Sequence, residues 1–316
     1  MSFWKGKRVL VTGGSGFVGG HLVGYVRQKG ATVIALGHQR VSVLGNLGSE
    51  CEHIVQDISD KGQVTRIMAA YRVDLVYHLA AQAIGSVAQQ CPVATLETNV
   101  QGTWNILESC RMLGVPAIIA SSDKAYGSSP PPYTEETPLS PAGIYETSKA
   151  CVDMIARSYY LTYKLPVAIT RCANIYGGWD RNFTRIVPYT ISQVLRGEPV
   201  EIWGDGLSKR DYIYIDDVVN AYVMLAEALM QGKFSGEVFN FGTGVATSVL
   251  DLVAMVNRIV GVDIPPNIHH KETGEIKEQW LNSYKAERFL GWKPKFSLEK
   301  GLRRTVGWYK EYLGFA

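Results

Sequence analysis

Residues 12–19 read TGGSGFVG and directly follow the short apolar run RVLV at residues 8–11. The glycines fit two registers: TGxxGxxG through Gly13, Gly16 and Gly19, or GxGxxG beginning at Gly14. A helical pattern at residues 17–29 starts inside the segment, so the glycines lie where a strand gives way to a helix. Such a turn lets the backbone approach a pyrophosphate, and the helix N-terminus offers unpaired N–H groups. The segment therefore predicts a dinucleotide-binding turn.

Beyond this turn, short apolar runs alternate with helical patterns. Strands are predicted at residues 32–36, 53–56, 75–79, 117–120 and 167–170, and helices at 93–113 and 145–164. Continuous apolar runs indicate strands buried on both faces, and their alternation with helices indicates a parallel sheet. The expected fold class is therefore α/β, with a Rossmann-type doubly wound parallel sheet.

The alternation of strand and helix patterns becomes less regular after about residue 175. Helices are predicted there at residues 218–229 and 249–259, and a strand at 237–241. The pattern predicts two domains. Residues 1–173 form the dinucleotide-binding Rossmann domain, to which residues 211–245 return. Residues 174–210 and 246–316 form a smaller C-terminal α/β substrate-binding domain.

Composition excludes several classes of protein. The chain has 316 residues, of which 46% are hydrophobic, and a formal net charge of only +3, which provides no electrostatic footprint for nucleic acid. No apolar run is long enough to cross a bilayer, and no secretory signal is evident. The five cysteines form no CxxC pair and the six histidines no HExxH, so no metal site is expected. These features predict a cytoplasmic protein without a membrane partner.

The end of the second predicted strand bears on the choice of dinucleotide. An acidic residue there would bind the ribose 2′-hydroxyl of NAD, but this chain has Gly37-His38-Gln39-Arg40. Either His38 or Arg40 meets a 2′-phosphate, which favours NADP, or both are solvent-exposed loop residues. Asp57, after the third strand, either contacts the adenine or caps a helix beginning near Ser59.

Two further motifs carry titratable side chains. Tyr145 and Lys149 form YxxxK on a predicted helix, where positions four apart share a face. A lysine ammonium there is expected to lower the pKa of the phenol, which can then exchange a proton with a hydroxyl. Ser122, Asp123 and Lys124 directly follow the fifth predicted strand, at the sheet edge where such folds bind ligands.

Taken in order, these motifs resemble the extended short-chain dehydrogenases/reductases, the NAD-dependent epimerases and dehydratases. The resemblance rests on the glycine turn, Ser122 and YxxxK, together with HLAA at residues 78–81, Asn99, RCANIYG at 171–177 and RDYIYIDD at 210–217. It covers nearly the whole chain and implies an enzyme that uses NAD or NADP on a nucleotide-diphosphate hexose. The residues expected to bind the dinucleotide are Gly13, Gly16, Phe17, Val18, His38, Arg40, Asp57, Ile58, Leu79, Ala80, Ala81, Asn99, Tyr145 and Lys149.

Within the family, Ser122-Asp123-Lys124 is similar to the Ser-Asp-Lys of CDP-glucose 4,6-dehydratases, and Ala80-Ala81-Gln82 is similar to the AAQ of the CDP-glucose and GDP-mannose enzymes. The resemblance implies a nucleotide-sugar 4,6-dehydratase in which Tyr145, Ser122 and Lys149 act at C4. Asp123 would protonate the departing C6 hydroxyl. Lys124 would remove the C5 proton or relay it, which requires a pKa well below the usual value of roughly 10.4.

Departures from this pattern keep other functions open. Ser86 and Ala88 stand where CDP-glucose enzymes usually have Arg and Ser, and Tyr126-Gly127 is more similar to epimerases. A nucleotide-sugar 4-epimerase, which needs no Asp123–Lys124 pair, is the nearest alternative. A uronate decarboxylase and a non-catalytic NAD(P)-binding protein are more remote.

The resemblance assigns the nucleotide-sugar contacts to the second half of the chain and to Gln82. Arg210 is expected to bind phosphate bidentately, whereas Trp203 either stacks on the base or belongs to the core. Arg185 either lines the site or pairs on a helix surface. The segment 274–280 is expected near the diphosphate, with Lys277 as its cation. The full set expected to bind substrate is Gln82, Asn174, Asn182, Arg185, Val187, Trp203 and Arg210.

Family members often dimerise through the helices expected at residues 93–113 and 145–164. Val100, Trp104 and Leu107 either form such an interface or pack in the core of the monomer. The resemblance therefore implies a homodimer.

Overall fold

The computed structural model describes residues 2–38, 51–271 and 276–315 of the chain. Its centre is a seven-stranded sheet in the order β11-β6-β5-β4-β1-β2-β3, and every neighbouring pair is parallel. The strands are β1 (Arg8–Thr12), β2 (Thr32–Gly37), β3 (Cys51–Val55), β4 (Leu75–His78), β5 (Ala117–Ala120), β6 (Val167–Cys172) and β11 (Val238–Phe241). The expected α/β fold with a Rossmann-type parallel sheet is confirmed.

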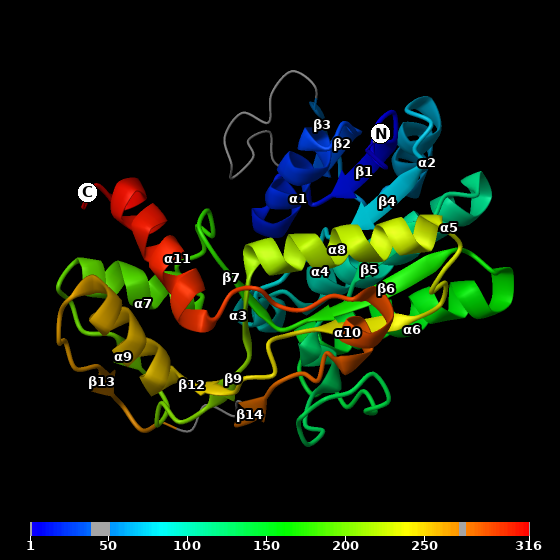
Figure 1. Cartoon of the computed structure of the whole chain (residues 1–316). Helices are drawn as coiled ribbons and strands as arrows, with labels where there is room; N and C mark the ends of the chain where they lie inside the picture. Colours follow the sequence, from blue (N-terminus) through cyan, green and yellow to red (C-terminus); the bar gives the residue numbers. More distant parts are fainter. Residues whose placement is uncertain (1, 39–50, 272–275, 316) are drawn as a thin grey trace.

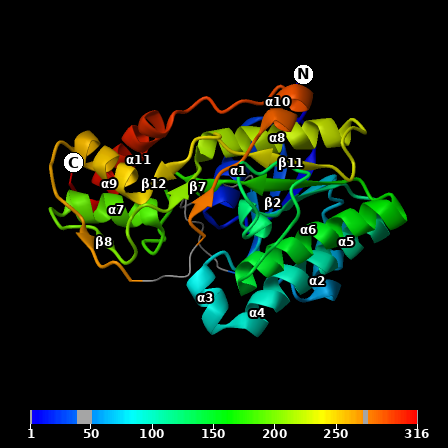
Figure 2. The same ribbon diagram turned by 90° about the horizontal axis from the view of Figure 1, so that it is seen from below.

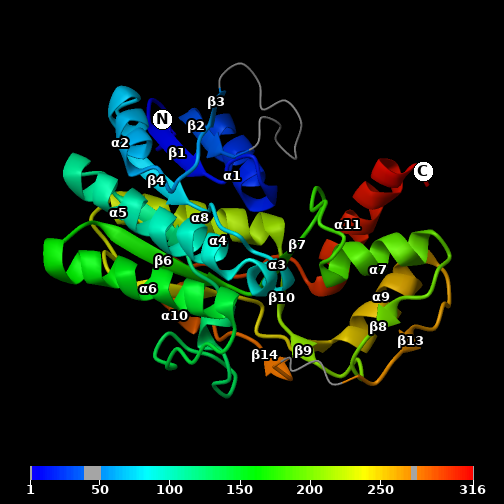
Figure 3. The ribbon, with the colours of Figure 1, turned by 180° about the vertical axis from the view of Figure 1, so that it is seen from behind.

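Both faces of the sheet are covered by helices, as the continuous apolar runs predicted. Val9 and Val11 of β1 point to one side and pack with α1 (Phe17–Gln28) and α8 (Ile215–Met230). Leu10 points to the other side, where α2 (Lys61–Ala70), α5 (Gly102–Leu113) and α6 (Ile144–Tyr163) lie. Figures 1 and 3 show these two helical layers from opposite sides. The carboxyl ends of the strands therefore meet at one edge of a sandwiched sheet.

Elements from the second half of the chain form a smaller group beside this edge (Figure 2). It contains α7 (Ile186–Leu195), α9 (Val249–Val260) and α11 (Leu298–Leu313), which pack on one another, with short strands between them. Ser248 and Ser297 cap α9 and α11 by accepting hydrogen bonds from the backbone N–H groups of Asp251 and Lys300. The short strands are β7 (Asn174–Tyr176), β8 (Glu201–Ile202), β9 (Lys209–Arg210), β10 (Tyr212–Tyr214), β12 (Thr247–Ser248), β13 (Asn267–Ile268) and β14 (Glu278–Gln279).

The chain crosses between the two groups more than once. β11 lies within residues 211–245 and pairs with β6 at the edge of the large sheet. The short helix α10 (Tyr284–Leu290) packs on β11, although it lies far along the chain. The division into two domains stays a prediction.

One predicted helix is interrupted. The pattern at residues 93–113 predicted a single helix, but the structure has α4 (Pro92–Leu96), a π-helical turn η1 (Glu97–Gln101) and then α5. Asn99 lies in the π turn and is buried, with its side chain bonded to neighbouring elements. A π turn admits one extra residue, and it lets Asn99 face inward while α5 keeps its own core face.

The remaining elements are α3 (Gly85–Gln90) and the 3₁₀ turn η2 (Asp123–Tyr126). In the part of the chain that the structure describes, no helix has the length and apolar character needed to cross a membrane.

Candidate active site

The glycine turn connects β1 to α1 and leaves no room for side chains. A Cβ on Gly19 would lie 2.1 Å from the carbonyl oxygen of Gly13, and one on Gly13, whose φ is +69°, would lie 2.9 Å from the Ala80 nitrogen. Gly16 is the N-cap of α1 and provides no side chain to cap it. The first N–H groups of the helix therefore face the carboxyl edge of the sheet uncapped, as a dinucleotide phosphate requires. Phe17 and Val18, half-buried, pack against the core beside them.

Thr12 joins this turn to the end of β4. Its hydroxyl accepts hydrogen bonds from the backbone N–H groups of Leu79 and Ala80, each at 3.2 Å, and pairs with Nδ1 of His78 at 2.8 Å. Burial lowers the pKa of His78 to about 3, and the charge of Lys149 acts in the same direction. His78 is therefore a neutral, buried support for the residues at 79–81.

Asn99 fixes the same loop from the π turn. Its Oδ1 accepts from the Gln82 backbone N–H at 2.7 Å, and its Nδ2 donates to the Gln82 carbonyl at 3.0 Å and to the Ser148 hydroxyl at 2.9 Å. Asn99 thereby ties the loop after β4 to α6. Direct contacts of Asn99, Ala81 or Gln82 with a ligand stay predictions.

The far end of the predicted dinucleotide site is only partly described. His38 is exposed just past β2, whereas Arg40 lies outside the described residues. The interpretation of Asp57 as a helix cap is wrong, because the cap of α2 is Asp60, which accepts from the Gln63 N–H. Asp57 is exposed and instead accepts from the Ser59 N–H at 2.8 Å. Ile58 is buried against Gly102.

Tyr145 and Lys149 lie on the first turns of α6, as predicted. Burial raises the pKa of Tyr145 to about 12, against the lowering effect of its hydrogen bond to Ser122. Burial also lowers the pKa of Lys149 to about 8, and its Nζ donates to the Ala120 carbonyl at 2.8 Å. The predicted lowering of the Tyr145 pKa by Lys149 is therefore wrong in this structure, because desolvation of the phenolate outweighs every favourable neighbour.

Ser122, Asp123 and Lys124 follow β5 and open the 3₁₀ turn η2. The Ser122 hydroxyl caps this turn by accepting from the Lys124 N–H, and donates to Oδ1 of Asp123 at 3.1 Å. Asp123 is buried, and its other oxygen, Oδ2, has no hydrogen-bond partner among the described residues. The charge of Asp123 also raises the pKa of Tyr145, so the carboxylate and the phenol share one site.

A buried network of hydrogen bonds connects η2 to α6, β6 and β11. Arg171 of β6 binds both carboxylate oxygens of Asp153 on α6, at 2.7 and 2.9 Å, and donates to the Tyr126 hydroxyl at 2.8 Å. Tyr126 in turn donates to Oδ1 of Asn240 on β11 at 2.7 Å. The network joins the helix that carries Tyr145 to the turn that carries Asp123, so it fixes their relative positions.

One functional candidate escaped the sequence analysis. Gln279 of β14 is buried, and its Oε1 accepts a hydrogen bond from Nζ of Lys124 at 2.7 Å. The two residues are 155 positions apart, and no local pattern connects them.

Arg185, Asn182 and Val187 lie at or before the start of α7. Arg185 pairs with Asp180 at 3.2 Å and is close enough for its charge to lower the pKa of Tyr145 against the dominant effect of burial. Oδ1 of Asn182 accepts from the N–H and hydroxyl of Thr184. The Val187 side chain is buried in the core, so only its backbone remains for a ligand.

The other predicted substrate residues lie on the short strands. Asn174 is half-buried in β7, and Arg210 in β9 donates to the carbonyls of Lys209 and Lys277. Trp203 is 55% exposed and stacks on His269 at 4.5 Å, so its interpretation as a core tryptophan is wrong. In the segment expected near the diphosphate, Lys277 is exposed, whereas Gly274 lies outside the described residues.

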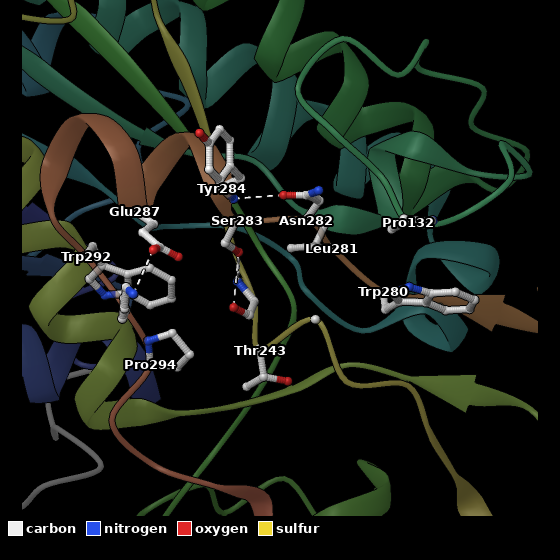
Figure 4. Close-up of a pocket in the computed structure, with 13 residues that line it drawn as sticks. Pro132, Thr243, Trp280, Leu281, Asn282, Ser283, Tyr284, Glu287, Trp292 and Pro294 are labelled. Atoms are coloured by element: carbon white, nitrogen blue, oxygen red, sulfur yellow. Dashed lines mark hydrogen bonds and ion pairs between the residues drawn. The ribbon is translucent and has the colours of Figure 1, made fainter.

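A hollow of about 490 Å³ opens elsewhere, beside the loops that follow β11 and β14 (Figure 4). Thr243, Trp280, Ser283 and Glu287 are among its lining residues, and none of the predicted catalytic side chains reaches it. It is therefore distinct from the cluster around Tyr145.

Residues 9–242 match the model of the NAD dependent epimerase/dehydratase family. The chain is 31% identical to the dTDP-glucose 4,6-dehydratase of Salmonella typhimurium, covering 96% of this chain and 92% of that one. It is similar to the solved UDP-glucose 4-epimerase of Thermotoga maritima with UDP-glucose, with a TM-score of 0.91, 34% identity and 97% and 99% of the two chains covered. It is also similar to a dTDP-glucose 4,6-dehydratase of Streptomyces venezuelae with NAD bound, with a TM-score of 0.87, 30% identity and 98% of each chain covered.

Proposed function

Since this chain belongs to the NAD dependent epimerase/dehydratase family, whose members include nucleotide-sugar dehydratases and epimerases, we propose that it is a nucleotide-sugar 4,6-dehydratase. The observation that carries the proposal is the Asp123–Lys124 pair, which lies beside Ser122 and Tyr145 with one buried carboxylate oxygen unpaired among the described residues. A 4-epimerase has no step that needs this pair. The substrate is a nucleotide-diphosphate hexose of the CDP-glucose or GDP-mannose type.

The first step acts at C4 of the hexose. Tyr145 takes the proton of the C4 hydroxyl, while Ser122 holds that oxygen by a hydrogen bond. The hydrogen bond of Ser122 and the charge of Arg185 both lower the pKa of Tyr145 against the dominant effect of burial. The chemistry that a bound dinucleotide supplies is reversible hydride exchange with the sugar. The uncapped turn at Gly13–Gly19, the loop at residues 79–81 and Lys149 would hold it.

The second step removes water across C5 and C6. The C4 ketone acidifies C5–H, and Lys124, in its neutral amine form, removes that proton as the C5–C6 double bond forms. Asp123, protonated, donates its proton to the departing C6 hydroxyl, which leaves as water. A proton then returns to C5 as hydride is added at C6, which gives the 4-keto-6-deoxy sugar.

A panel of CDP-, GDP-, dTDP- and UDP-hexoses, incubated with NAD⁺ or NADP⁺, tests this function. We expect one of them to lose the mass of one water and the cofactor to be regenerated. A changed sugar configuration without loss of mass would identify a 4-epimerase instead, the second candidate, which the similarity to the Thermotoga maritima enzyme favours. Titration with both dinucleotides tests the preference for NADP that the missing carboxylate after β2 suggests.

Replacing Asp123 with Asn should separate the two chemical steps. The amide keeps the size of the side chain but has no proton to give at the pH of the reaction, so water loss should fall by roughly 10²-fold or more. Oxidation at C4 should persist, and reduced dinucleotide should accumulate in stopped-flow absorbance. Equal loss of both steps would show that Asp123 only supports the fold around Ser122.

We also propose a homodimer. Leu107 is fully buried in the monomer core, but Trp104 is 44% exposed, and Met154 and Leu161 on the neighbouring helix α6 are exposed as well. Exposed apolar groups on adjacent helices are typical of an interface. Trp104→Glu should yield a monomer by light scattering after size exclusion, whereas Val262→Glu, at another exposed apolar position, should not. A monomeric parent protein would contradict the proposal.

A further inference from the structure

The side chains of Lys124 and Gln279 meet across the site. Lys124 extends from η2, directly after the large sheet, and its Nζ donates to Oε1 of Gln279 at 2.7 Å. Gln279 lies on β14, which belongs to the short strands beside that sheet. The contact therefore joins the acid–base pair of the proposed reaction to a part of the chain that carries none of the other predicted catalytic groups.

Gln279 itself is held rigidly. Its side chain and backbone are 1% exposed, and its carbonyl accepts from the Asp211 N–H at 3.0 Å. In the parallel ladder of β14 and β9, Gln279 stands opposite Arg210, the residue proposed to bind the diphosphate. A lysine on its flexible four-carbon stem loses much conformational freedom when it is fixed, so a rigid acceptor decides where its nitrogen rests.

One buried atom beside this contact lacks a hydrogen bond. Among the described residues, Oδ2 of Asp123 has no hydrogen-bond partner, whereas the Gln279 side chain lies against Tyr133, whose pKa it lowers against the dominant effect of burial. The unpaired carboxyl oxygen can therefore form a hydrogen bond with a sugar hydroxyl, which both donates and accepts. Buried polar groups are rarely left unpaired in native proteins, and exceptions gather at sites that receive a ligand or act in catalysis.

We propose that Gln279 is a positioning residue for the water-elimination step: its Oε1 holds the Lys124 side chain against C5 of the hexose, beside Asp123. The inference rests on the proposed dehydratase function and deepens it. Gln279 does not act at C4, where Tyr145, Ser122 and Lys149 work without it. Its loss should therefore affect the second step alone.

The test uses the full-length protein with the hexose that the panel identifies. Gln279→Met keeps the volume of the side chain but removes the acceptor, and Gln279→Asn keeps the amide one methylene shorter. We expect kcat for water loss to fall on the order of 100-fold in Gln279→Met, the scale of a misplacement of about 1 Å, with a smaller loss in Gln279→Asn. KM and the rate of C4 oxidation, followed by reduced-dinucleotide absorbance, should stay within about twofold.

A matched control lies one residue earlier on the same strand. The carboxylate of Glu278 forms a surface ion pair with Lys209 at 3.0 Å, and Glu278→Gln should leave both steps unchanged. Incorporation of solvent deuterium at C5 gives a second readout, since it reports proton removal directly. It should fall in Gln279→Met together with water loss.

Two results would overturn the proposal. Unchanged water loss and C5 exchange in Gln279→Met would show that Lys124 needs no acceptor. A parallel fall in C4 oxidation, with a lower melting temperature, would indicate a purely structural role, and Gln279→Asn then tests the position with the milder change. If the parent protein dehydrates no hexose, the proposed dehydratase function itself is wrong, and this outcome is distinct from any difference between the Gln279 variants and the parent.

Discussion

Tyr145→Phe should abolish turnover at C4, with a rate lower by roughly 10²- to 10⁴-fold, the range for removal of a general acid–base group. The phenol is the group that exchanges a proton with the substrate, and phenylalanine preserves its ring but has no proton to exchange. The loss should appear before any other step, so no reduced dinucleotide should form in a single turnover. This behaviour contrasts with Asp123→Asn, in which reduced dinucleotide accumulates.

Tyr163→Phe is the matched control for this change. Tyr163 ends the same helix α6, and it is 56% exposed. Its substitution should leave the rate and the dinucleotide affinity unchanged, and dinucleotide titration should show that Tyr145→Phe still binds the dinucleotide. Substantial turnover by Tyr145→Phe would exclude the phenol as the C4 acid–base group and would favour a binding protein or a different catalytic residue.

Lys149→Met should lower the rate and raise stability at the same time. Lys149 is only 5% exposed, and burial lowers its pKa from 10.5 to about 8. At pH 7 the folded protein therefore keeps a buried ammonium, at a cost on the order of 3 kcal/mol relative to the unfolded chain. Methionine fills similar space without the charge, so part of this cost should be regained.

The cost of the buried Lys149 ammonium to the free energy of unfolding should depend on pH. Because the folded pKa lies below the unfolded one, the unfolded chain binds more protons between about pH 8 and pH 10.5. The penalty is complete below pH 8 and disappears as the pH rises through this window. Denaturant unfolding of both proteins at pH 7 and pH 10 measures it: the advantage of Lys149→Met should be large at pH 7 and small at pH 10. An advantage independent of pH would mean that the ammonium is not the destabilising group.

The sequence predicted the strand and helix alternation because each element carries its own periodicity. The predicted strands at residues 32–36 and 117–120 lie within one residue of β2 and β5, and the glycine turn lies where β1 meets α1. The YxxxK motif could also be predicted from the sequence, since both of its residues belong to one helix. These features depend on neighbours a few positions apart.

Other features depend on contacts that no local pattern records. The role of Gln279 follows from its meeting with Lys124, 155 positions away. The π turn follows from the bonds of Asn99 to Gln82 and Ser148, and the pattern of apolar residues continued across it without a visible break. The raised pKa of Tyr145 follows from burial by several elements, whereas the sequence suggested only the nearby lysine.

The π turn at Glu97–Gln101 also changes how the chain tolerates insertion and deletion. Removing one residue there would restore an ordinary α-turn and leave α5 close to its present phase, because the π turn already absorbs one extra residue. Ile106, Leu107 and Cys110 would stay in the core, whereas the inward place of Asn99 would be lost. The same deletion made within α5 itself would rotate every later residue by about 100° and turn these three side chains out of the core. The π turn is therefore the place in this helix where a single residue can be lost at the expense of the site and not of the core.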